Sequence, residues 1–81
     1  MDLRQVLGVN VRSCRHKIGL SQEELAFRAG LHRTYVSGVE RGVRNPTVLI
    51  LGKLAKALRT EPNALLEKIP RGVQTPRSSR S

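Results

Sequence analysis

The chain has 81 residues, of which 15 are Lys or Arg and 6 are Asp or Glu, so its formal net charge is +9. A chain this short forms one domain with a thin core and leaves no room for a deep catalytic cleft. Aromatic residues make up only 2% of it, which predicts an aliphatic core and argues against recognition of single strands by base stacking. The pI near 11.4 favours a polyanionic partner such as nucleic acid, although a solubilising surface or a basic tail would give the same charge.

The sequence does not have the pattern of a secreted or membrane protein. Cys14 is its one cysteine, which excludes an internal disulfide and a cysteine-rich zinc site. The longest apolar run, residues 48–51, is far shorter than the ~20 residues of a membrane span, and residues 1–4 do not open a signal peptide. We therefore expect a soluble protein of a reducing compartment, with no membrane partner.

The first predicted helix spans residues 3–17. Leu7, Val11 and Ile18 recur at spacings of four and seven, which predicts an apolar stripe facing the core. Gly19 follows the helix and is typical of a helix end.

The second and third predicted helices have the outline of a helix-turn-helix motif. Ser21 and Glu24 match a capping box, in which each side chain bonds the backbone N–H of the other residue, and this places Gln22 at the first exposed helical position. Gly30 ends the second helix. A turn of about three residues then leads to a third helix over residues 32–41.

The third predicted helix has an apolar side and a polar side without a carboxylate. At about 100° per residue, the polar side holds Arg33, Thr34, Ser37, Gly38 and Arg41. Arg bonds guanine bidentately, and Thr and Ser bond base edges, so this side suits the major groove of DNA. A solvated surface helix would also show polar residues. Glu40 lies toward the apolar side, where a carboxylate needs a buried partner.

A fourth helix is predicted over residues 48–58, with Thr47 as its N-cap, and Pro62 opens a fifth. The apolar residues of these two helices exceed what a thin core needs, which predicts a self-complementary patch and a homodimer. The patch would contain Leu49, Ile50, Leu65, Leu66 and Ile69. Alternatively, these residues only complete the core of a monomer.

Residues 70–81 read PRGVQTPRSSRS, and we expect them to form a disordered basic tail. Such a segment cannot bury enough apolar area to offset the entropy lost on ordering. Residues 1–69 form the predicted domain. They keep 12 basic and 6 acidic residues, so the domain is itself basic.

Several short runs closely resemble the Cro/C1-type helix-turn-helix domains of phage repressors and bacterial regulators. They are GLSQEELA (19–26), AG (29–30), YVS (35–37), ERG (40–42) and NP (45–46). The resemblance covers about residues 7–67 and implies an all-α, five-helix Cro/C1 repressor-like domain. Within that family, residues 31–45 look most like the controller proteins of restriction–modification systems.

The resemblance also implies a role for each matching residue. Base contacts would come from Arg33, Thr34 and Ser37. Contacts with the DNA backbone or the edge of the minor groove would come from Gln22, Tyr35, Arg41, Arg44 and Asn45. Arg15 would pair with Glu40 and fix the first helix against the third.

The predicted function is that of a sequence-specific transcriptional regulator in the bacterial cytoplasm, nucleoid-associated when bound. It would bind a palindromic operator in double-stranded DNA as a homodimer. Activation would need a contact with RNA polymerase, for which Glu23 is a candidate. An antitoxin whose main partner is a toxin protein, and a bridging factor with little sequence preference, are alternatives with the same fold. Cys14, His16 and His32 are not spaced as metal ligands or a catalytic pair, so we expect no enzyme, metal or cofactor.

Overall fold

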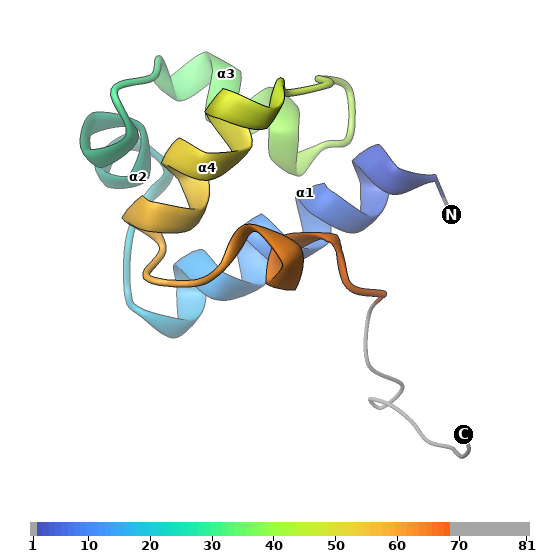
Figure 1. The fold of residues 1–81 in the computed structure, drawn as a ribbon. Helices are drawn as coiled ribbons and strands as arrows, with labels where there is room; N and C mark the ends of the chain where they lie inside the picture. The colour runs from blue at the N-terminus through green and yellow to red at the C-terminus, as the bar shows by residue number, and fades with distance from the viewer. Residues whose placement is uncertain (1, 69–81) are drawn as a thin grey trace.

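The computed structural model describes residues 2–68, and every regular element in that range is a helix (Figure 1). Its elements are α1 (Leu3–Lys17), α2 (Gln22–Ala29), α3 (Arg33–Glu40), α4 (Val48–Ala57) and the 3-10 helix η1 (Pro62–Leu66). The all-α prediction is confirmed, and the predicted bounds of the first four helices are within one residue of those observed. Ile69 and the predicted tail, residues 70–81, lie outside the described residues.

Of the four α-helices in residues 2–68, three begin with a side-chain cap. The predicted capping box is confirmed: Ser21 Oγ accepts the N–H of Glu24 at 3.0 Å, and Glu24 Oε1 accepts the N–H of Ser21 at 2.9 Å. Thr47 caps α4, also as predicted. A second capping box, formed by Asp2 and Gln5, begins α1 and was not predicted. These caps satisfy backbone donors that have no partner inside the helix.

One residue of the predicted apolar stripe is misplaced. Ile18 is the C-cap of α1 and is 37% exposed, so its prediction as a core residue is wrong. The helix ends at Lys17, and Gly19 then turns the chain toward α2 with a φ of +73°. The regular helical spacing that would have carried Ile18 inward therefore stops before it.

The fifth helix is a short 3-10 helix, where an α-helix had been expected. η1 has five residues and no side-chain cap. Asn10 on α1 donates from Nδ2 to the carbonyl oxygens of Leu65, at 2.9 Å, and Glu67, at 2.7 Å. These carbonyl groups thus accept hydrogen bonds from α1, and η1 does not extend into a longer helix. The described range holds four α-helices, which corrects the prediction of five.

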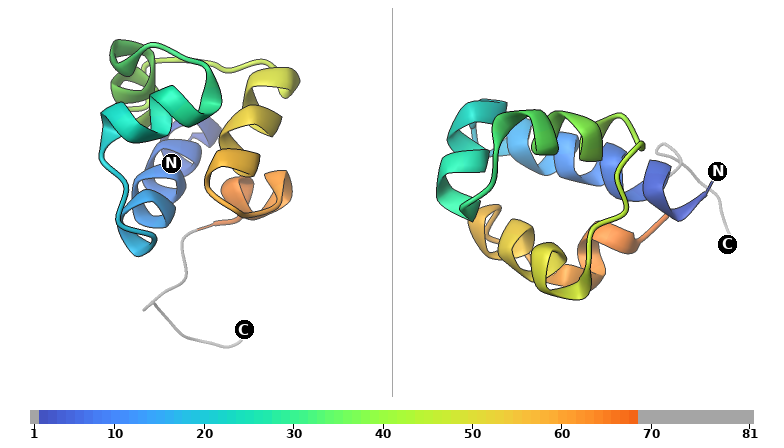
Figure 2. Two further views of the ribbon diagram at one scale, coloured as in Figure 1. Left: turned by 90° about the vertical axis from the view of Figure 1, so that its left-hand side faces the viewer. Right: turned by 90° about the horizontal axis from the view of Figure 1, so that it is seen from above.

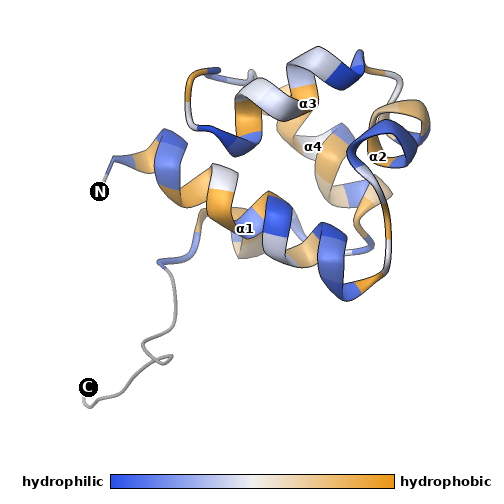
Figure 3. Cartoon of the chain, turned by 180° about the vertical axis from the view of Figure 1, so that it is seen from behind, coloured by the Kyte–Doolittle hydropathy of each residue, from blue (hydrophilic) through white to orange (hydrophobic). Residues whose placement is uncertain are grey.

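The elements pack in a closed ring around one core. α3 contacts α1 and α2, α4 contacts α2 and η1, and η1 returns to α1. Figure 2 shows this ring from above, with α1 on one side and α4 with η1 on the other. Hydrophobic stretches recur between hydrophilic ones along α1 in Figure 3, as expected for a helix with one apolar side. The largest fully buried side chains are all aliphatic, as predicted: Leu25, Leu54, Leu65, Val11, Val36 and Val39.

Candidate nucleic-acid interface

The inner side of α3 lies directly on α1. A Cβ atom added to Gly8 would stand 2.6 Å from the backbone oxygens of Val39 and Glu40, so this close crossing requires a glycine. Val36 and Val39 of α3 have no exposed surface. The crossing fixes α3 against α1 and thereby decides which of its side chains face outward.

A buried ion pair fastens the same crossing. Arg15 Nε donates to Glu40 Oε2 at 2.6 Å, and Arg15 Nη2 donates to Glu40 Oε1 at 2.9 Å. The two side chains keep only 10% and 5% of their surface exposed. Arg15 Nη1 also donates to the carbonyl oxygen of Leu20, in the connection between α1 and α2. The predicted pair is therefore present, and it joins three parts of the chain.

The ionisation of Glu40 follows from its surroundings. Burial by itself would raise the pKa of this carboxyl, but hydrogen bonds from Arg15 and Gln22 and the positive charges of Arg15 and Arg12 outweigh burial, so the pKa lies below its ordinary value. The hydrogen bonds that Arg15 donates to Glu40 raise the pKa of Arg15. Both groups are charged at neutral pH, as a bidentate buried pair requires.

Gln22 extends this network to α2. Its Nε2 donates to Glu40 Oε1 at 3.1 Å, and the residue is half-buried. The side chain predicted to contact a phosphate thus holds the start of α2 against the end of α3. Its contact with DNA stays a prediction.

The connection after α3 turns the chain back along the helix. The N–H of Gly42 bonds the carbonyl of Val39 at 3.1 Å, and the N–H of Val43 bonds the carbonyl of Gly38 at 3.0 Å. This pair of bonds, with a φ of +78° at Gly42, is a Schellman motif. The turn returns Arg44 to α3, where its stem lies against Gly38.

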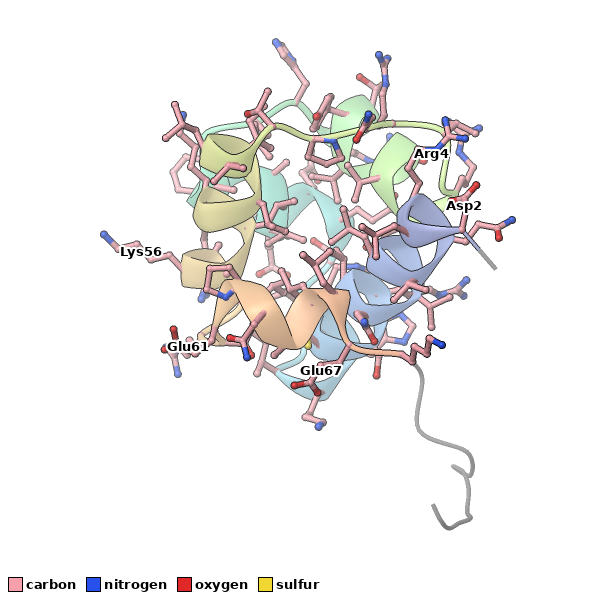
Figure 4. All side chains as sticks on the ribbon, turned by 45° about the vertical axis from the view of Figure 1, so that its right-hand side comes forward. Asp2, Arg4, Lys56, Glu61 and Glu67 are labelled. Carbon is pink, nitrogen blue, oxygen red and sulfur yellow. The ribbon has the colours of Figure 1, made fainter. Side chains whose placement is uncertain are left out.

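We call the outward side of α3 and its following loop the α3 surface. It consists of Arg33, Thr34, Ser37, Arg41, Arg44 and Asn45, all exposed except the half-buried Ser37. Within residues 2–68, none of its three arginines makes an ion pair. Figure 4 shows Glu61 and Glu67 at the opposite end of the molecule, and Asp2 beside Arg4 at the start of α1. The α3 surface is therefore a cationic surface free to meet an anion.

Two residues near this surface lie differently from the sequence-based expectation. The helical wheel placed Gly38 on the exposed side, but it is buried because the stem of Arg44 covers it. Tyr35 is half-buried and packs against the core, and the guanidinium carbon of Arg44 lies 5.5 Å from the centre of its ring. The predicted contact of Tyr35 with DNA is not tested by this arrangement.

Comparison with known proteins shows the family. The helix-turn-helix family model matches residues 11–65 of the chain. The chain belongs to the Cro/C1-type helix-turn-helix family. It is 52% identical to the control protein C.SmaI of Serratia marcescens over 68 residues, which are 84% of this chain and 81% of that protein.

Solved structures agree with this assignment. The restriction–modification controller protein C.AhdI of Aeromonas hydrophila superposes with a TM-score of 0.74 at 50% identity, covering 76% of this chain and 94% of that chain. The controller protein C.Esp1396I, solved as a tetramer in complex with its natural 35 base-pair operator, gives a TM-score of 0.73 at 32% identity, covering 80% of this chain and 86% of that chain. This helix-turn-helix protein is thus a transcriptional regulator related to restriction–modification controller proteins, a DNA-binding class that is not enzymatic.

The apolar patch predicted on the last two helices of this regulator is only partly exposed. Leu65 has no exposed surface and belongs to the monomer core, so its assignment to a dimer interface is wrong. Leu49 is 79% exposed, and Ile50 and Leu66 are half-buried. Ile69 lies outside the described residues.

Two exposed apolar residues beside this patch were missed. Val48 is 83% exposed and Leu3 is 60% exposed. Together with Leu66, they line an open apolar cavity of about 200 Å³ between α1, α4 and η1. The run of four apolar residues at 48–51 was the available signal, because at 100° per residue such a run cannot face the core throughout.

Residues 2–68 contain neither a candidate metal site nor a candidate membrane-spanning helix. No group of three or more His, Cys, Asp or Glu residues in that range could hold a metal ion. Cys14 is a half-buried free thiol. No helix in the same range is both long and apolar enough to span a bilayer.

Proposed function

We propose that this regulator binds a specific operator in double-stranded DNA, with α3 in the major groove. The observation that carries the proposal is the α3 surface: a cationic face without an internal ion pair, on a helix held from behind by the buried Arg15–Glu40 pair. A rigid helix whose exposed arginines form no ion pair within residues 2–68 has the geometry that major-groove recognition needs.

Within this proposal, the residues divide by the part of DNA they would meet. Arg33, Thr34 and Ser37 read base edges, because they occupy the outward side of α3. The remaining residues contact phosphates or the minor-groove edge and fix the register: Gln22, Tyr35, Arg41, Arg44 and Asn45. Tyr35 and Gln22 already have partners in the protein: the Tyr35 ring contacts Arg44, and Gln22 Nε2 donates to Glu40. They would contact DNA through the polar atoms that these interactions do not use.

We further propose that the binding unit is a homodimer on a palindromic operator. Val48 and Leu49 begin α4 with 83% and 79% of their surface exposed. Adjacent exposed apolar side chains of this size are typical of a protein–protein interface. The similar protein C.Esp1396I forms a tetramer on its operator, which supports self-association in this fold. A two-fold dimer would present two copies of α3 about one helical turn of DNA apart.

Sedimentation equilibrium at micromolar concentration tests the dimer. The full chain should sediment as about twice its 9.0 kDa mass, and Leu49→Glu should reduce it to a monomer because a buried charge opposes the contact. Phe27→Glu is the matched control, since Phe27 is an apolar residue with 87% exposure on α2. A wild-type monomer, or a Leu49→Glu dimer, contradicts the proposal.

Selection of bound sites from random DNA at a defined salt concentration tests whether the protein has a specific operator. The proposal expects an enriched two-fold symmetric sequence with half-sites about 10 base pairs apart. Flat affinity across sequences would favour the bridging factor instead, and co-purification with an unrelated protein would favour the antitoxin.

For activation, we propose Glu23 as a contact with RNA polymerase in the bacterial cytoplasm. Glu23 is exposed at the start of α2, whereas Glu24 is engaged with Ser21. Transcription from the operator in vitro, with Glu23→Gln compared with wild type, tests this: activation should fall while operator affinity is kept.

A further inference from the structure

Gly38 stands at a position where glycine has a conformational cost. It is the sixth residue of the eight-residue helix α3, and glycine inside a helix is less stable than alanine. Its backbone is helical, so no turn requires it. The reason for a glycine must therefore lie in what surrounds it.

The space beside Gly38 is filled by Arg44. A Cβ atom at position 38 would stand 2.7 Å from Arg44 Cγ, closer than side chains can pack, and 3.2 Å from Arg44 Nε, which is a tight contact. The Schellman turn at Gly42 folds the chain so that Arg44 crosses α3 at this point. The stem of Arg44 thus occupies the volume that any other residue at position 38 would need.

The far end of Arg44 is held as well. Its guanidinium carbon lies 5.5 Å from the centre of the Tyr35 ring, within the range of a cation–π contact. Tyr35 lies three residues before Gly38 on α3, so its side chain is the neighbour along the helix. Tyr35 itself packs against the core. The helix therefore holds the stem of Arg44 at Gly38 and its guanidinium at Tyr35, about one helical turn away.

We propose that Gly38 is a positioning residue for DNA recognition: the space it leaves open orders Arg44 on the α3 surface before DNA binds. The proposal rests on the proposed DNA-binding function and identifies what orients one of its cationic contacts. An arginine loses much rotamer freedom when it is fixed in a complex, and fixing it in advance removes part of that loss.

Gly38→Ala is the direct test. Because the new methyl meets a flexible side chain and not backbone, α3 keeps its fold and Arg44 must leave its place. Ordering one long side chain changes affinity by about 2- to 12-fold, so operator binding should weaken by that factor, but by no more than Arg44→Ala weakens it.

A double-mutant cycle separates positioning from a general effect on folding. In the Arg44→Ala background the space is empty, so adding Gly38→Ala should leave operator affinity unchanged and raise the melting temperature. Equal losses of affinity in both backgrounds would show that Gly38 acts without Arg44 and would overturn the proposal. So would full affinity of the single Gly38→Ala variant.

A second readout needs no DNA. Tyr35 is the one tyrosine of the chain, so its ring signals in an NMR spectrum are unambiguous. Gly38→Ala should shift them in the same direction as Arg44→Ala, because both remove the guanidinium from the ring. Gly52→Ala in α4 is the matched control, since a Cβ there has no neighbour within 4 Å; it should leave the Tyr35 signals in place.

The two readouts distinguish failure of this inference from failure of the proposed function. If the wild-type chain selects no DNA sequence, the proposed function fails while the Tyr35 signals still test the position of Arg44. If DNA is selected but Gly38→Ala leaves the Tyr35 signals unmoved, the positioning role fails and the function stands.

Discussion

The two sides of α3 differ in how many partners their polar groups have inside the protein. On the inner side, Glu40 accepts three hydrogen bonds, from Arg15 and Gln22, and Gly8 lets the backbone of α1 touch that of α3. On the outer side, Arg33 and Arg41 are exposed and form no ion pair within residues 2–68. The polar groups on the inner side are hydrogen-bonded within the protein, whereas the arginines on the outer side remain available to a partner.

This difference predicts that the inner side determines the stability of the fold and the outer side determines DNA binding. A change on the inner side removes contacts that exist in the free protein, so it should reduce stability. A change on the outer side removes contacts that form only with DNA, so it should reduce binding and leave stability within about 0.5 kcal/mol. Arg44 lies between the two cases, because the free protein already orders it against Gly38 and Tyr35.

Glu40→Ala should give the largest effect. It leaves the guanidinium of Arg15 buried without its counter-charge, which costs about 3–5 kcal/mol of unfolding free energy. Urea denaturation at pH 7 measures the loss. Glu23→Ala is the control, because Glu23 is an exposed carboxylate and should change stability little. Equal effects of the two variants would contradict the buried pair.

Gly8→Ala should come next. Its methyl group meets two backbone oxygens that cannot rotate away, so the helices must separate, at a cost of about 1–3 kcal/mol. Gly52→Ala inserts the same methyl group into open space and should be neutral or slightly stabilising. Thermal unfolding of both variants checks the contrast, and a stable Gly8→Ala protein would show that α1 and α3 are not in close contact.

Arg44→Ala should mainly affect binding. As a phosphate contact, its loss should weaken binding to all DNA sequences about equally and reduce the salt slope of the affinity by about 1. Titration of operator and unrelated DNA at several salt concentrations measures both. Weakening confined to the operator would instead assign Arg44 to base recognition.

Lowering the pH should reduce the stability contributed by Glu40, with a smaller effect than the substitutions above. The folded-state pKa of Glu40 is below its ordinary value, so the stability it contributes is complete above about pH 4.3 and is lost as the pH falls through the folded value. Wild type should therefore lose more unfolding free energy than Glu40→Gln between pH 7 and pH 3. Asp2 and Glu24 also have lowered pKa values, but they contribute equally in both proteins. Parallel urea curves for the two proteins would contradict this account.

Local patterns predicted the features that depend on nearby residues. The Ser21–Glu24 box, the Thr47 cap and the polar side of α3 each depend on spacings of a few residues, and all three are present. Glu40 was predicted to need a buried partner because a helical wheel shows an inward carboxylate, and the family resemblance supplied Arg15 as that partner.

The misplaced features depend on contacts between distant segments. η1 ends where Asn10, 55 residues away from Leu65, bonds its carbonyl group, and no local pattern contains that bond. The burial of Leu65 follows from the same docking against α1. Gly38 was assigned to the exposed side because a helical wheel does not show that a later turn returns Arg44 to it.

The central claim is that the outer side of α3 reads the DNA sequence, and Arg33 tests it most directly. Site selection from random DNA should be run on wild type and Arg33→Ala at the same salt concentration. We predict that Arg33→Ala loses preference at one base position in each half-site, with about 1–3 kcal/mol weaker operator binding and unchanged stability. An identical selected sequence for the two proteins would contradict the claim.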